Sequence, residues 1–179
     1  MKLIVGLGNP GSKYAFNRHN VGFILIDLLV QELGASLKED KKFKAELAKS
    51  KKLSEDIVLV KPMTYMNLSG SAVNKVASYF KIKPSNIIVF YDDIDMEKGK
   101  VRFRANGGHG GHNGVRSLIQ ELGSDEFSRV KVGVGRPSSE SKQSVSSWVL
   151  DDFVEQDLSE LKETIFPQTL LKLDKFLNN

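Results

Sequence analysis

His19, one of three histidines in a sequence of 179 residues without cysteine, ends a polar loop that contains several carboxamides. An imidazole with an ordinary pKa of about 6.5 can take a proton from water near neutral pH when an acceptor fixes its tautomer. Asp92, which directly follows an apolar run, is a candidate for that acceptor. The pair predicts a general base that activates water. The alternatives are a structural hydrogen bond for the histidine and a helix cap or solvated turn for the aspartate.

Three asparagines supply neutral donors that could work beside such a base. Asn9, Asn67 and Asn113 each lie in a polar segment that follows a predicted strand. Amide groups can hold an ester or stabilise a developing oxyanion without adding charge. For Asn67 and Asn113 the alternative is a helix N-cap, which propensity favours slightly for Asn67. No G-x-S-x-G nucleophile elbow occurs, so hydrolysis by activated water is favoured over an acyl-serine intermediate.

Two other motifs raise the question of a cofactor. Residues 6–11 match G-x-G-x-x-G, but the next helical pattern starts only near Asn20, and no acidic residue follows at the spacing of a dinucleotide site. His109 and His112 lie in a glycine-rich loop without a cysteine or carboxylate at ligand spacing, which argues against a metal. The sequence therefore predicts neither metal nor cofactor.

The composition is that of a globular chain with a slight excess of positive charge. Lys and Arg number 26 against 22 Asp and Glu, and the net charge of +4 permits a polyanionic partner without requiring one. We interpret the lysines at 38, 41, 42, 44, 49, 51 and 52 as a solvated face, with phosphate binding as a secondary role. The lack of cysteine fits the cytoplasm, and no apolar run approaches the ~20 residues that a bilayer requires.

Strand and helix patterns alternate along the chain. Strands are predicted at residues 2–7, 56–61, 86–91, 100–104 and 129–135, and helices at about 20–33, 69–80, 115–122 and 155–177. Residues 37–52 form an exposed strand or loop in this interpretation, and residues 138–147 a serine-rich connector. This order predicts a single α/β domain over residues 1–179, with a mixed, largely parallel sheet flanked by helices on both faces and strand 86–91 near its centre.

The polar segments of such a fold should gather in one place. Ligands bind outside the carboxyl ends of strands in open sheets, and the unusual polar segments follow strands here. They are residues 9–20, 63–69, 92–95 and 106–113. We expect them to converge on one edge of the sheet.

Four blocks follow one another in order between residues 5 and 114. They are VGLGNPG at 5–11 with Tyr14 and RHNVG at 18–22, TYMNLSG at 64–70, DDID at 92–95, and GGHGGHNG at 107–114. In content and spacing they resemble the bacterial peptidyl-tRNA hydrolases. The resemblance implies a monomeric α/β enzyme that needs no metal. Such an enzyme cleaves the ester joining a peptide to the 3′-terminal ribose of tRNA and returns free tRNA to translation.

The resemblance also implies roles for individual residues. His19 stands at the position of the catalytic histidine and Asp92 at that of the carboxylate that orients it. Asn9 matches the asparagine that holds the scissile ester and its oxyanion, with Asn67 and Asn113 at the other two site asparagines. The wider set implied to bind substrate is Tyr14, Tyr65, Met66 and His112 along the peptide and 3′-end groove, and Arg104 and Lys131 on the tRNA 5′-phosphate.

Some positions depart from the common pattern of the family. Tyr65 stands where phenylalanine is frequent, Tyr91 where histidine is frequent, and His109 where a smaller residue is usual. None of these changes removes a catalytic group. Arg129, on the same strand face as Lys131, is the alternative for the phosphate contact. The alternative functions are an RNA-binding relative without catalysis and, more remotely, a nucleotide-binding module.

Overall fold

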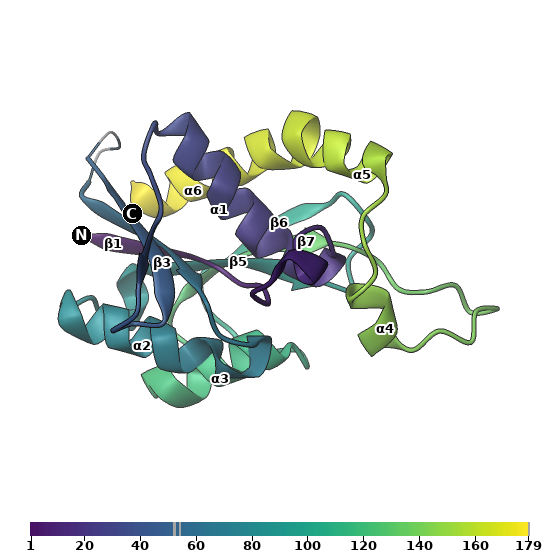
Figure 1. The fold of residues 1–179 in the computed structure, drawn as a ribbon, viewed down its shortest axis with the longest axis horizontal. Coiled ribbons are helices and arrows are strands. Elements are labelled where there is room, and N and C mark those ends of the chain that lie inside the picture. The colour runs from purple at the N-terminus through teal and green to yellow at the C-terminus, as the bar shows by residue number, and fades with distance from the viewer. Residues whose placement is uncertain (52, 54, 179) are drawn as a thin grey trace.

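The computed structural model describes residues 1–51, 53 and 55–178 and contains one seven-stranded sheet, in which the apolar runs of the sequence form the interior strands β1, β4 and β5. The strands lie in the order β2-β3-β4-β1-β5-β7-β6. Figure 1 shows the sheet between two layers of helices. Strands β4, β1, β5 and β7 are parallel, whereas the pairs β2–β3, β3–β4 and β6–β7 are antiparallel. The bounds are β1 Lys2–Gly6, β2 Lys38–Asp40, β3 Ala45–Ser50, β4 Ile57–Pro62, β5 Ile87–Asp93, β6 Val101–Arg104 and β7 Ser128–Gly133. The predicted fold class and the interior position of residues 86–91 are confirmed.

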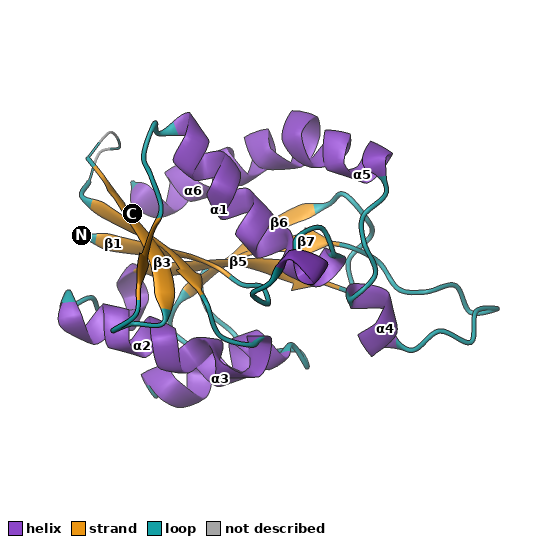
Figure 2. Ribbon diagram, viewed as in Figure 1, coloured by secondary structure: helices purple, strands orange, loops and turns teal. Residues whose placement is uncertain are grey.

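Helices cover both faces of this sheet (Figure 2). On one face lie α1 (Val21–Glu32), α5 (Glu155–Glu160) and α6 (Phe166–Leu177), and on the other lie α2 (Ser69–Tyr79) and α3 (Asn113–Leu122). Because side chains alternate along a strand, β1 serves both layers. Ile4 packs under α1 and α6, while Leu3 and Val5 pack against α2 and α3. In the described part of the chain, no helix has the length and apolar character needed to cross a bilayer.

The lysine-rich segment forms the antiparallel hairpin of β2 and β3 at one edge of the sheet. Its described lysines are exposed, which confirms the solvated face at positions 38, 41, 42, 44, 49 and 51. Lys52, which the sequence analysis placed in the same face, lies outside the described residues.

Two stretches near the C-terminus differ from the sequence prediction. The connector predicted at 138–147 was wrong in its last residues, because α4 occupies Val145–Val149. Ser144 caps this helix by accepting a hydrogen bond from the backbone nitrogen of Ser147 at 3.1 Å. A helix of 5 residues is too short to show helical periodicity. The helix predicted at 155–177 is interrupted by a π-helical turn just before Pro167, whose ring nitrogen has no hydrogen to donate.

Gly22 lets the first turn of α1 press against the ends of β1 and β5. A Cβ here would overlap the carbonyl oxygen of Phe90 and the backbone nitrogen of Leu7. Gly6 makes the matching approach from β1, since its Cβ would overlap the carbonyl oxygen of Gly22. The helix begins well after the glycine motif, unlike the helix of a dinucleotide site. The glycines therefore set the position of α1 and of His19 just ahead of it.

Gly22→Ala is expected to lower the free energy of unfolding by about 1–3 kcal/mol, because the added methyl group meets fixed backbone on two sides. Urea unfolding followed by circular dichroism measures the change. Gly108→Ala is the matched control, since Gly108 is surrounded by open space, and its effect should stay within about 0.5 kcal/mol. Equal stability of the two variants would contradict the packing role of Gly22.

Candidate active site

The polar segments of the sequence line one cavity of about 600 Å³. Those after β1, β4 and β5 reach it directly from the carboxyl ends of parallel strands. β6 runs the other way, so the glycine-rich residues 105–112 carry the chain back along the sheet before α3 starts. The predicted site residues in the lining are Asn9, His19, Tyr65, Met66, Asn67, Asp92, His112, Asn113 and Lys131. Tyr14, in the turn Ser12–Tyr14, and Arg104, on β6, lie outside it.

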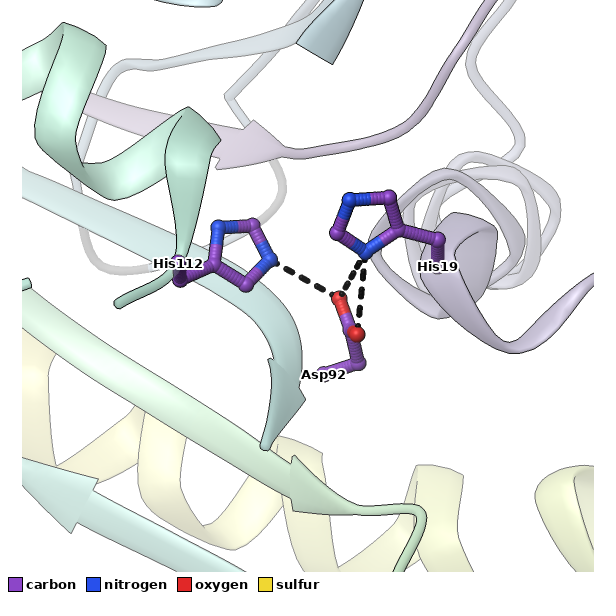
Figure 3. Close-up of side chains that lie close together, drawn as sticks. All are labelled: His19, Asp92 and His112. Atoms are coloured by element: carbon purple, nitrogen blue, oxygen red, sulfur yellow. Dashed lines mark hydrogen bonds and ion pairs between the residues drawn. The ribbon is translucent and has the colours of Figure 1, made fainter. Parts of the chain in front are cut away.

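Asp92 stands between two imidazoles at the end of β5 (Figure 3). Its carboxylate oxygens lie 2.9 and 3.0 Å from Nδ1 of His19, which is held by the short turn Arg18–Asn20 before α1. Oδ1 also lies 2.9 Å from Nε2 of His112, at the start of α3. The aspartate side chain is 2% exposed and that of His19 is 14% exposed. Three elements distant in sequence therefore build one hydrogen-bonded group.

The N-terminus of α3 fixes the tautomer of His112. Its Nδ1 accepts hydrogen bonds from the backbone nitrogens of Gly114 at 3.1 Å and Val115 at 3.3 Å. The hydrogen of this neutral ring is therefore on Nε2, which donates it to Asp92. Since Asp92 accepts from both rings, Nδ1 of His19 is the donor on the other side. That arrangement leaves Nε2 of His19 with a free lone pair for acid–base work.

The surroundings move the pKa of both partners. Burial lowers the pKa of His19, but the negative charge and hydrogen bond of Asp92 outweigh it, so the pKa lies above its ordinary value. Burial alone would raise the pKa of Asp92, but its contacts with His19 and His112 hold it well below its usual range. The aspartate is therefore ionised throughout the pH range in which His19 titrates.

Asn9 presents a donor in a fixed orientation. Its Oδ1 accepts a hydrogen bond from the backbone nitrogen of Met66 at 2.7 Å. Asn20 holds its backbone on both sides, with Oδ1 accepting from the Asn9 nitrogen at 2.8 Å and Nδ2 donating to the Asn9 carbonyl at 2.9 Å. Because Oδ1 is used by Met66, Nδ2 is the Asn9 group that remains for a ligand in the cavity. The sequence analysis missed the role of Asn20, although it stands beside His19.

Asn67 and Asn113 are exposed residues of the cavity lining. The alternative interpretation of both as helix N-caps was wrong. The residue before α2 is Leu68, and the cap of α3 is the imidazole of His112. Oδ1 of Asn113 accepts from Nη1 of Arg116 at 3.3 Å, within the first turn of α3. Neither amide is therefore used as a helix cap, and Nδ2 of Asn113 remains for a ligand.

Two cationic residues, Arg104 on β6 and Lys131 on β7, lie on neighbouring strands. Lys131 lines the cavity and its Nζ lies 2.9 Å from Oδ2 of Asp93. Arg102 is its direct cross-strand partner, which places Arg104 diagonally from it on the same face of the sheet. Arg104 is exposed. The register therefore puts both residues on one face of the sheet, on neighbouring strands.

Arg129 is not available as the alternative cation. It is 1% exposed, and its guanidinium donates to the carbonyl oxygens of Asp125, Phe127 and Gly107. Burial also lowers its pKa. Its contact with Gly107 ties the glycine-rich loop to the start of β7.

Several lining residues were missed by the sequence analysis. Arg136, which follows β7, forms an ion pair with Asp95 at 2.6 Å, and Val145, Val149 and Leu150 line the cavity from α4 and the residue after it. Polar residues after strands were the signal used elsewhere, and the same rule applied to β7 would have found Arg136. The α4 residues had no comparable signal.

His19, Asp92 and His112 are also the place where a metal ion could be considered, because one donor atom from each lies within 4.8 Å of the others. The hydrogen-bond pattern does not fit such a ligand set. Nε2 of His112 carries its hydrogen toward Asp92, since Nδ1 of the same ring accepts from the backbone. It offers no lone pair to a cation. The group is suited to proton transfer.

Comparisons with known proteins identify one family. A family model described as peptidyl-tRNA hydrolase matches residues 3–179. A peptidyl-tRNA hydrolase of an Exiguobacterium species is 52% identical over 165 residues, which cover 92% of this chain and 88% of the relative. That of Lactobacillus helveticus is 42% identical over 177 residues, 99% of this chain and 93% of the relative. The crystal structure of peptidyl-tRNA hydrolase from Acinetobacter baumannii has a TM-score of 0.84 at 35% identity, covering 99% of this chain and 94% of that one. The chain belongs to the peptidyl-tRNA hydrolase family.

Proposed function

We propose that this protein hydrolyses the ester bond between a peptide, or an N-blocked amino acid, and the 3′-terminal ribose of tRNA. The observation that carries the proposal is the contact of 2.9 Å between Nδ1 of His19 and Asp92, inside a cavity that the amide of Asn9 also lines. Family membership supplies the substrate class. The products are a peptide with a free carboxyl group and a tRNA ready for reuse in translation.

The reaction uses His19 first as a base and then as an acid. Nε2 takes a proton from water while the water oxygen attacks the ester carbonyl, and Asp92 stabilises the imidazolium that forms. Nδ2 of Asn9 donates a hydrogen bond to the oxyanion of the tetrahedral intermediate. The intermediate then expels the ribose oxygen, which receives the proton from His19. No covalent enzyme intermediate is required.

The remaining predicted residues bind substrate in this proposal. Asn67, Asn113, Tyr65 and Met66 line the groove for the peptide and the 3′ end, and Tyr14 contributes at its rim from the neighbouring turn. His112 contacts the bound chain end and holds Asp92 in place. The proposal assigns the whole site to one chain, so a monomer suffices. We place the enzyme in the cytoplasm, where translation releases its substrate.

The direct experiment is single-turnover hydrolysis of N-acetyl-phenylalanyl-tRNA, followed by release of labelled N-acetyl-phenylalanine. Acceleration well above the spontaneous rate is expected. Binding of the tRNA without acceleration would favour the alternative of a non-catalytic RNA-binding relative. Saturable binding of NAD or ATP would favour the nucleotide-binding module instead.

Asn9→Asp is expected to lower turnover by about 10²-fold, because one oxyanion donor is lost. The new carboxylate keeps an acceptor for the backbone nitrogen of Met66, but it presents a negative oxygen where Nδ2 stood. Single-turnover hydrolysis measures the change. Asn74→Asp on α2, outside the cavity lining, is the matched control and should retain the wild-type rate. Equal rates for the two variants would remove Asn9 from the oxyanion role.

Arg104→Gln and Lys131→Gln are each expected to raise KM about tenfold with little change in kcat, since each removes a charge-assisted hydrogen bond to the tRNA 5′-phosphate. The effect should disappear with a substrate that lacks the 5′-phosphate. Lys38→Gln is the control, because β2 and β6 form opposite edges of the sheet. The same KM increase with and without the 5′-phosphate would contradict this assignment.

A further inference from the structure

Trp148, the single tryptophan of the chain, lies against the residue that precedes the proposed catalytic base. The guanidinium carbon of Arg18 is 3.7 Å from the centre of the Trp148 ring. Nη1 of Arg18 also donates to the carbonyl oxygens of Trp148 at 3.2 Å and of Asp151 at 3.3 Å. Arg18 and His19 share the turn Arg18–Asn20. The stack therefore joins that turn directly to the α4 region.

Backbone hydrogen bonds also join the segment of Arg18 to the chain that follows α4. The nitrogen of Arg18 donates to the carbonyl of Asp151 at 3.1 Å, and the nitrogen of Phe153 donates to the carbonyl of Phe16 at 2.8 Å. These bonds hold the chain after α4, whereas α4 itself is contacted by the side chain of Arg18. Nε1 of Trp148 donates to the carbonyl of Gly135 at 2.9 Å, just beyond β7. The indole thus spans the space between the turn of His19 and the end of the sheet.

The helix that carries Trp148 forms a wall of the cavity. Val145, Val149 and Leu150 line it, but Trp148 does not. The half-buried indole instead contacts Arg18, which is not in the cavity lining either. The wall and the turn of His19 are therefore joined by a side-chain contact outside the cavity.

We propose that the Arg18–Trp148 stack is a positioning contact that holds the α4 wall of the cavity and the imidazole of His19 in one geometry. This inference rests on the proposed function. Guanidinium groups stack favourably on the face of an indole, and the planar contact restricts both partners. Loss of the stack removes the side-chain contact between α4 and the turn Arg18–Asn20, so that the two can shift slightly relative to each other. A misplacement of about 1 Å at a reacting group can reduce turnover by up to about 10²-fold.

A double-mutant cycle on kcat tests the stack. Trp148→Leu and Arg18→Gln are each expected to lower kcat for N-acetyl-phenylalanyl-tRNA about tenfold. The double variant should lose clearly less than the product of the two single losses, because the stack is deleted in both, although each change also removes hydrogen bonds of its own. Trp148→Phe keeps an aromatic face and should restore kcat to within about threefold of the wild type. Losses that multiply in the double variant, or equal rates for the Leu and Phe variants, would overturn the proposal.

Folding and fluorescence complete the experiment. Trp148 belongs to neither of the two apolar clusters of the core, so the variants should keep the wild-type circular dichroism spectrum. Tyr79→Leu removes another aromatic ring with a cation above it, that of Lys42 at 4.4 Å, and should leave kcat unchanged. In Arg18→Gln the fluorescence emission of Trp148 is expected to shift, and unchanged emission would contradict the contact between Arg18 and the indole.

An inactive wild type would overturn the proposed function and this inference together. An active wild type with an equally active Trp148→Leu variant would overturn the inference alone.

Discussion

A His19→Ala variant is expected to hydrolyse N-acetyl-phenylalanyl-tRNA about 10²–10⁴-fold more slowly than the wild type in single turnover. The substitution removes the lone pair of Nε2. Asp92 keeps this lone pair available by binding Nδ1 of the same ring, and His19 lies in the cavity lining. The affinity for tRNA should change little, because binding is assigned to other residues.

His109→Ala is the matched control for that experiment. Nδ1 of His109 accepts a hydrogen bond from the backbone nitrogen of Gly111 at 2.9 Å, within the glycine-rich loop. His109 also lines the cavity, so this control removes a histidine from the same cavity and leaves His19 and Asp92 unchanged. Retention of near wild-type turnover by His19→Ala, or an equal loss in His109→Ala, would take the general-base role away from His19.

Asp92→Asn is expected to cost as much as about 10⁴-fold in turnover at saturation, the loss seen when the aspartate of a Ser-His-Asp triad is changed in this way. The new amide can turn its NH₂ group toward Nδ1 of His19, and the ring then carries its hydrogen on Nε2. The base is lost through the wrong tautomer although both side chains remain. tRNA affinity should stay close to that of the wild type.

The pH profile distinguishes this explanation from a loss of binding. The base works only when neutral, and Asp92 raises its pKa, so wild-type turnover should fall as the pH decreases through a value above 6.5. In Asp92→Asn the imidazolium loses its anionic partner, and the acid limb of the residual activity should move to lower pH. Rates measured at saturating substrate from pH 5 to 9 test the shift. A collapse of affinity with an unchanged rate at saturation would make Asp92 a binding residue.

Much of this site could be predicted because its residues follow strands that are recognisable as apolar runs. Residues 2–7 and 86–91 predicted the strands that deliver Asn9 and Asp92, and parallel strands bring their carboxyl ends together. The fold class follows from the same alternation of strand and helix patterns.

The details that could not be predicted depend on how individual side chains are oriented and how deeply they are buried. Lys131 and Arg129 share one face of β7, and a period of two cannot tell them apart. The chain before β7 wraps Arg129 in carbonyl oxygens while Lys131 remains at the cavity. Likewise, the cap of α3 falls to His112 rather than Asn113 because of how the imidazole is turned, which spacing does not reveal. In both cases the sequence pointed to the right segment, and tertiary packing decided which of its residues takes the role.

The two outermost strands of the sheet have a further consequence for solubility. Unpaired strand edges invite pairing with other chains, and short, charged strands discourage it. β2 consists of Lys38, Glu39 and Asp40, and the four residues of β6 include Arg102 and Arg104. Arg104, proposed to contact the tRNA 5′-phosphate, thus also protects the β6 edge against self-association, together with Arg102. Apolar replacements there should promote aggregation at high protein concentration, independently of any effect on the nucleic acid.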